Sequence, residues 1–181
     1  DWPGNRDEVY ALIDTIIKAS TAVDGLTGEK GLAGYTTIGP RALAELLGRY
    51  TRMDDDFLPE MLRRHPVLHQ TWRFHVDTIC LDRYYPQIGD TGSFAKQMTR
   101  YLGVDLGRAV SLDPSGFSFL WRLYELTGDA AFVQMLYRSN NEAVDGLPYD
   151  LFVESPESFQ HAVAAGIERE GTSPRLGSVH K

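Results

Sequence analysis

Residues 8–17 read EVYALIDTII and set a pattern that recurs along the chain. The apolar side chains of this stretch are spaced i, i+3, i+4, i+7 and i+8, which places them on one face of an α-helix. They are Val9, Leu12, Ile13, Ile16 and Ile17. Because Asn5 and Glu8 are spaced as a capping box, we expect this helix to begin near Asn5 and to end near Val23.

The same helical period returns further along the chain, whereas alternating strand patterns are scarce. Pro40, Pro66 and Pro156 stand where helices begin, a position that tolerates the missing N–H of proline. We expect further helices at about 40–50, 57–64, 66–81, 93–102, 115–127, 129–140 and 156–170. The short loops between them predict antiparallel helical hairpins, as in bundles, helical repeats and α/α toroids. The expected fold class is therefore all-α.

Composition limits the partners of the chain. Its 181 residues carry 18 Lys and Arg against 25 Asp and Glu, a net charge of −7. This balance disfavours nucleic acid, because phosphate binding needs basic side chains. No apolar run approaches the roughly 18 residues of a membrane span, and acidic residues interrupt the first twenty positions. We therefore expect neither a nucleic-acid nor a membrane partner, and no signal peptide in this stretch.

A glycine-rich stretch from Asp24 to Gly39 lacks helical spacing and indicates a long loop, a feature that is uncommon in compact helical domains unless it is functional. Tyr35 stands near its end, with Lys30 and Arg41 close in sequence. A tyrosine phenol is a poor base near neutral pH because its free pKa is about 10, and a neighbouring cation lowers that value. Two interpretations stay open here: Tyr35 is an acid–base residue, or its ring is an aromatic plug that closes the loop onto the core.

Other polar residues that suggest chemistry also have structural interpretations. Asp90 lies in a glycine-flanked turn, where a carboxylate either fixes the turn or acts as an acid. His65 and His69 are spaced i, i+4, but no glutamate completes a metal motif, so we expect no metal site. Apolar neighbours predict a hydrogen-bonded core position for His75 and a buried thiol for Cys80.

Two segments together resemble a known family. Residues 24–35 (DGLTGEKGLAGY) are similar to the D-G-x-Y-x-E-K-S-x-x-Y segment of heparinase II/III-like polysaccharide lyases. Residues 85–92 (YPQIGDTG) resemble the P-x-[IF]-G-D-[ST] stretch that such proteins carry later in their helical domain. The chain departs from the family at Gly31, where serine is usual, and at Leu26 or Thr27, where tyrosine is common.

The resemblance implies an incomplete α/α toroid over residues 1–172, with a linker at 173–181 toward a β-sandwich domain of the same parent chain. Family members cleave uronate-containing acidic polysaccharides by β-elimination, which implies a periplasmic or secreted location. By this resemblance Tyr35 is the catalytic acid–base residue. Substrate contacts are expected at Glu29, Lys30, Arg41 and Asp90.

The resemblance also implies that catalysis needs more than this chain. The family's Asn/His segment, which neutralises the substrate carboxylate, has no counterpart before the first helix. The histidines and metal ligands of the sandwich domain would lie outside the chain, so we expect no cofactor and no metal ion within it.

Two other functions stay open. One is a non-catalytic helical module that binds glycan or a partner protein, in which aromatic side chains stack on sugars. Its candidate stacking residues are Trp2, Trp72, Trp121, Tyr84 and Tyr85. The other is a toroid glycoside hydrolase that uses a carboxylate pair such as Glu29 and Asp90.

Overall fold

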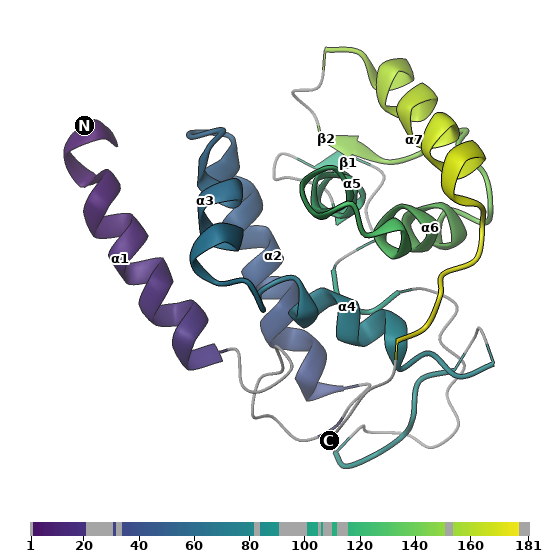
Figure 1. The fold of residues 1–181 in the computed structure, drawn as a ribbon, viewed down its shortest axis with the longest axis horizontal. Helices are drawn as coiled ribbons and strands as arrows, with labels where there is room; N and C mark the ends of the chain where they lie inside the picture. The colour runs from purple at the N-terminus through teal and green to yellow at the C-terminus, as the bar shows by residue number, and fades with distance from the viewer. Residues whose placement is uncertain are drawn as a thin grey trace.

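A computed structural model describes residues 2–20, 31, 34–81, 84–90, 101–104, 106, 110–111, 116–150 and 154–177. In these parts the chain is all-helical, which confirms the expected fold class, apart from a parallel pair of two-residue strands. Figure 1 shows the elements in order: α1 Trp2–Ser20, η2 Tyr35–Thr37, α2 Ile38–Thr51, α3 Phe57–Arg64, α4 Gln70–Asp77, β1 Val110–Ser111, α5 Gly116–Thr127, α6 Ala130–Ser139, β2 Tyr149–Asp150 and α7 Pro156–Glu170. The closure of these helices into a toroid stays a prediction.

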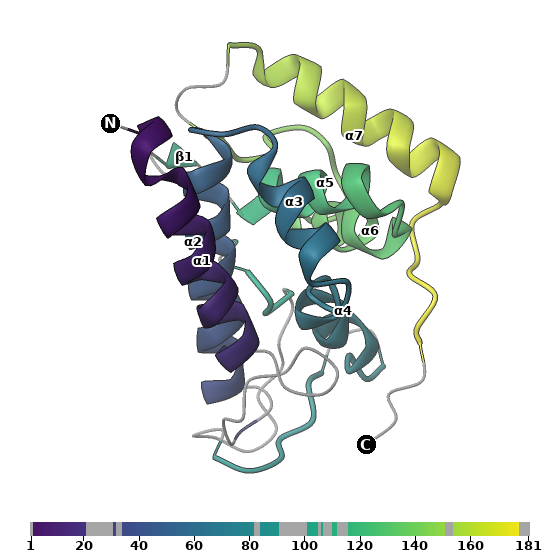
Figure 2. The same cartoon turned by 60° about the vertical axis from the view of Figure 1, so that its left-hand side comes forward.

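The helices form two groups with α4 between them (Figure 1). Helices α1, α2 and α3 lie at one end of the molecule, and α5, α6 and α7 lie at the other. Helix α4 contacts α6, and α2 contacts both α3 and α5, so one apolar core runs through both groups. Figure 2 shows the stretch after α7 running back along the molecule, where the Gly177 amide donates to the Asp77 carboxylate at 2.7 Å.

Helix α1 buries only Ile13 and Ile17 of the expected apolar face, together with Tyr10, and it has a different start. Tyr10, Ile13 and Ile17 are buried, whereas Leu12 is 60% exposed. The helix begins at Trp2 rather than near Asn5, so the predicted capping box is wrong. Its first turn contains a proline. The first N–H groups of a helix have no partner within the helix, so the missing N–H of proline costs no hydrogen bond there.

Helix α3 has the predicted bounds, but α4 is shorter than predicted. Sequence periodicity predicts a helix over 66–81, and the structure has helix only over Gln70–Asp77. Residues 66–69 form turns instead, and at the other end the Thr78 hydroxyl donates to the Phe74 carbonyl at 2.9 Å. The backbones of Cys80 and Tyr84 then exchange two hydrogen bonds, of 2.7 and 2.9 Å, which stops helical pairing. As a result Cys80 is exposed, and its predicted burial is wrong.

The last three helices lie within one residue of their predicted bounds. The Asp129 side chain caps α6 by accepting from the Ala131 amide at 3.0 Å. A predicted helix at 93–102 falls mainly outside the described residues, and Tyr101 and Leu102 are not helical. None of the described helices is both long and apolar enough to cross a membrane.

Candidate functional site

Tyr35 opens the short η2 turn directly before α2, and its side chain is 51% exposed. The turn is held by its own backbone: the amides of Gly34 and Thr36 donate to the Gly31 carbonyl at 3.0 and 3.2 Å. The Thr37 hydroxyl donates to the Gly34 carbonyl at 2.8 Å. A half-exposed ring on such a turn does not fill the core, so the interpretation of Tyr35 as an aromatic plug is not supported.

The two family-like segments meet at Gly31 and Asp90, which are 59 positions apart in sequence (90 − 31). A Cβ placed on Gly31 would lie 2.0 Å from the Asp90 carbonyl oxygen and 2.6 Å from its carbonyl carbon. The backbone at Gly31 also has a φ of +97°, a conformation that side chains disfavour. Glycine is therefore required at this position.

Of the remaining predicted contact residues, the structure describes two. Asp90 and Arg41 are exposed, and Arg41 lies in the first turn of α2, six positions after Tyr35. Glu29 and Lys30 lie outside the described residues. The structure therefore brings the segment that ends in Tyr35 against the backbone of Asp90.

His75 occupies the buried centre of the molecule, as its apolar neighbours predict. Its Nδ1 donates to the Thr71 carbonyl at 3.2 Å, while its Nε2 and the Thr71 hydroxyl have no partner among the described residues. Burial lowers the pKa of His75 to about 4, because the protonated ring loses its hydration there. His75 is thus a neutral core histidine near neutral pH.

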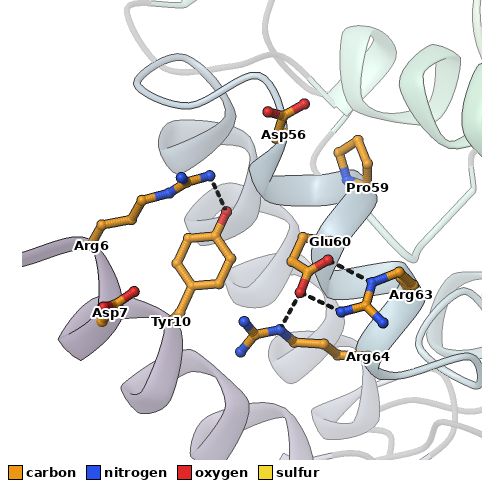
Figure 3. A pocket seen from close by; sticks show the side chains of 8 residues that line it. All are labelled: Arg6, Asp7, Tyr10, Asp56, Pro59, Glu60, Arg63 and Arg64. Carbon is orange, nitrogen blue, oxygen red and sulfur yellow. Dashed lines mark hydrogen bonds and ion pairs between the residues drawn. The ribbon is translucent and has the colours of Figure 1, made fainter. Parts of the chain in front are cut away.

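Figure 3 shows a cavity of about 480 Å³ between α1 and α3 that sequence reasoning did not predict. It is lined by Arg6, Asp7, Tyr10, Asp56, Pro59, Glu60, Arg63 and Arg64. Tyr10 donates to the Asp54 carboxylate at 3.1 Å, and the Arg6 guanidinium bonds both Tyr10 and Asp54. The sequence signal for this arrangement is the i, i+4 spacing of Arg6 and Tyr10, which places both on one helix face.

Arg63 and Arg64, two basic side chains of this cavity, are paired with carboxylates. Glu60 accepts from Arg63 and Arg64 at 2.7 Å, and these bonds lower the pKa of its carboxyl to about 2. Asp14 accepts from Arg64 at 2.7 Å and lies 2.6 Å from Nε2 of His65. Burial raises the pKa of Asp14, but these hydrogen bonds outweigh it and hold that pKa below its ordinary value. The Asp14 contacts and the Arg6–Asp54 pair together form an ionic seam that joins α1 to α3 and to the loop before it.

A second cavity, of about 620 Å³, lies beside α5 and α7. Trp121, Tyr124 and Arg169 line it, and the Tyr124 hydroxyl donates to Glu170 at 2.9 Å. The Trp121 ring also packs against α7, since a Cβ on Gly166 would lie 3.3 Å from the ring. Of the aromatic residues proposed to stack on sugars, Trp72 and Tyr85 are buried and inaccessible.

Within the described part of the chain, no three His, Cys, Asp or Glu side chains gather as metal ligands would. Tyr35, Arg41 and Asp90 line neither of the two cavities described above. Comparison with family models, curated proteins and solved structures finds no match to this chain.

Proposed function

We propose that this chain is part of a polysaccharide lyase of the heparinase II/III-like type, which cleaves uronate-containing polysaccharides by β-elimination. The observation that carries the proposal is the contact between the two family-like segments: Gly31 lies against the Asp90 backbone, and Tyr35 is half-exposed on the turn that Gly31 anchors. An exposed phenol on a turn that is held between segments far apart in sequence supports Tyr35 as a candidate acid–base group.

The proposed chemistry needs one proton acceptor and one proton donor. The acceptor removes the proton on the sugar carbon beside the carboxylate, and the electron pair forms a double bond to carbon 4. The bond from carbon 4 to the glycosidic oxygen breaks, and that oxygen receives a proton. In the proposal the Tyr35 phenolate takes the first proton, and the resulting phenol can supply the second.

The substrate carboxylate must be neutralised for this reaction, because negative charge builds up on it as the proton leaves. Arg41 is our candidate within the described residues, since a guanidinium suits bidentate binding of a carboxylate. Lys30 and Glu29 complete the proposed substrate contacts together with Asp90. We propose that the rest of the toroid and a β-sandwich domain belong to the parent polypeptide, that no cofactor is held by this chain, and that the parent acts in the periplasm or outside the cell.

The test is to incubate the parent polypeptide with alginate, pectate and heparan sulfate and to follow ultraviolet absorbance of unsaturated uronate ends. Absorbance that rises with enzyme concentration supports the proposal. Saturated reducing ends would instead select a hydrolase that uses Asp90. Cleavage of none of the three polymers, with the protein folded, would contradict the lyase assignment.

A non-catalytic glycan-binding module is the second candidate, and the cavity beside α5 and α7 favours it. The half-buried Trp121 offers ring surface there, and Glu125, Arg169 and Glu170 offer hydrogen-bonding groups for hydroxyls. The test is an NMR titration of the chain with neutral cello- and xylo-oligosaccharides. Shifts confined to Trp121 and its neighbours, without cleavage by the parent, would favour this function.

A further inference from the structure

Tyr85 connects the segment that carries Asp90 to helix α4. Its hydroxyl donates to the His75 carbonyl at 2.6 Å, and its ring is only 3% exposed. Burial raises the pKa of the Tyr85 phenol, so the hydroxyl keeps its proton and remains a donor. The 84–90 segment is therefore fixed to α4 at Tyr85 and, through the pairing of Tyr84 with Cys80, to the stretch just after α4.

The same helix holds the segment that carries Tyr35. The Trp72 indole nitrogen donates to the Pro40 carbonyl at 3.2 Å, and Pro40 lies in the first turn of α2 directly after η2. Figure 1 places the start of α2 and the described segment 84–90 at the same end of the molecule. Helix α4 thus anchors both segments, through Trp72 and His75, which are three positions apart.

The two anchored segments contact each other through backbone atoms. No side chain separates Gly31 from the Asp90 carbonyl, since even a Cβ would overlap it. The Gly31 carbonyl in turn receives the amides of Gly34 and Thr36, on either side of Tyr35. A shift of the 84–90 segment must therefore be transmitted to the turn that presents Tyr35.

We infer that Tyr85 is a positioning residue, which sets the separation of Tyr35 and Asp90 by seating the 84–90 segment on α4. The effect on catalysis rests on the proposed function, whereas the coupling between the two segments does not. Removing the Tyr85 hydroxyl releases one segment and loosens the turn on the other.

Tyr101 provides a matched control. Its hydroxyl donates to the Trp72 carbonyl at 2.7 Å, and its ring is 2% exposed. Tyr85→Phe and Tyr101→Phe therefore each remove one buried hydroxyl that bonds an α4 carbonyl, and each keeps the ring. Only Tyr85 lies in the segment that contacts Gly31.

The experiment compares amide hydrogen exchange at Gly34 and Thr36 in the two variants of this chain, each corrected for its measured global stability. We expect Tyr85→Phe to speed exchange at both amides by about tenfold or more and Tyr101→Phe to leave them unchanged. Equal rates in both variants would overturn the inference. A residue with only a structural role would change the global stability and not the corrected exchange rates. The exchange rates at Gly34 and Thr36 therefore distinguish a positioning role from a packing role.

Two further measurements keep the inference testable if Tyr85→Phe folds poorly. Gly31→Ala pushes on Asp90 from the other segment, and we expect it to shift the methyl resonance of Ile88, whereas Gly128→Ala does not. An unshifted Ile88 resonance would contradict the coupling.

In the parent polypeptide we expect Tyr85→Phe to lower kcat by about tenfold and Tyr101→Phe by less than about twofold. If the wild-type parent cleaves no uronate polymer, the proposed function fails, and the exchange rates still decide the positioning role.

Discussion

The indole nitrogen of Trp72 donates a 3.2 Å hydrogen bond to the carbonyl oxygen of Pro40, inside a fully enclosed part of the core. The bond joins the first turn of α4 to the first turn of α2 and so fixes the chain just after Tyr35. The Trp72 ring also meets Phe119 edge-on, with ring centroids 4.9 Å apart. One side chain therefore links three helices of the molecule: α2, α4 and α5.

Replacing Trp72 with phenylalanine should destabilise the fold. The smaller ring leaves a cavity and removes the donor to Pro40, which together cost about 2–4 kcal/mol. The half-buried Trp121 is the control, and Trp121→Phe should cost about 1 kcal/mol or less. Urea unfolding of both variants measures the difference in the free energy of unfolding. Equal losses would show that the bond to Pro40 and the enclosed position of Trp72 add nothing to stability.

Gly31→Ala should be more disruptive than an alanine at another glycine with positive φ. Gly128 has a φ of +68°, and a Cβ added there would meet nothing within 4 Å, so Gly128→Ala should cost about 1 kcal/mol from backbone strain alone. Gly31→Ala adds a clash with the Asp90 carbonyl and should cost about 2–3 kcal/mol. Thermal and urea unfolding compare the two. Similar losses would mean that the segments do not touch in solution.

Stability should fall on mild acidification because of His75. Its pKa is about 4 in the folded chain against an ordinary value of 6.5, so the unfolded chain binds the proton first as pH decreases. The neutral ring favours folding above pH 6.5, and this advantage is lost as pH falls toward 4. We expect the free energy of unfolding to be about 2 kcal/mol lower at pH 5 than at pH 7.

His75→Leu should flatten that dependence between pH 7 and pH 5, since leucine does not titrate. The lowered carboxyl pKa values of Asp14 and Glu60 affect stability at lower pH and leave this window clear. Urea titrations at each pH provide the measurement. The same slope in the variant and the wild type would assign the pH dependence to other groups.

Within the ionic seam, Asp54 should contribute more to the stability of the fold than a carboxylate in an exposed ion pair does. Asp54 accepts from Arg6 at 2.7 Å and from Tyr10 at 3.1 Å, and its side chain is 9% exposed. Asp54→Asn should cost about 1–2 kcal/mol, because it weakens both bonds. Glu45→Gln removes an exposed pair with Arg49 and should change stability by less than about 0.5 kcal/mol. An equal effect of the two substitutions would argue against the seam.

Helical periodicity alone predicts most of the fold. The stretches around Phe57, Gly116 and Pro156 have clear apolar faces and end signals, and their helices match the expected bounds within one residue. The same reasoning overextends α4, because Val67 and Leu81 continue the apolar pattern while both are exposed. The Cys80–Tyr84 pairing that ends this helix depends on tertiary placement, which periodicity does not contain.

The candidate site is predictable only in part. The sequence leaves Tyr35 open between an acid–base residue and an aromatic plug, and only the structure places its side chain 51% exposed. The sequence also carries no sign that Gly31 lies against Asp90. That contact depends on Trp72 and Tyr85, whose roles are hydrogen bonds to backbone carbonyls and leave no motif. The cavity between α1 and α3 is likewise built from side chains of separate helices.

The most direct measurement is the rate of β-elimination by the parent polypeptide carrying Tyr35→Phe, with Tyr137→Phe on α6 as the control. If Tyr35 is the acid–base residue we propose, loss of its hydroxyl should lower kcat by at least about 100-fold. The fold should stay intact by circular dichroism, and Tyr137→Phe should stay close to wild type. Undiminished formation of unsaturated uronate by Tyr35→Phe would contradict the role of this residue and with it the proposed acid–base site.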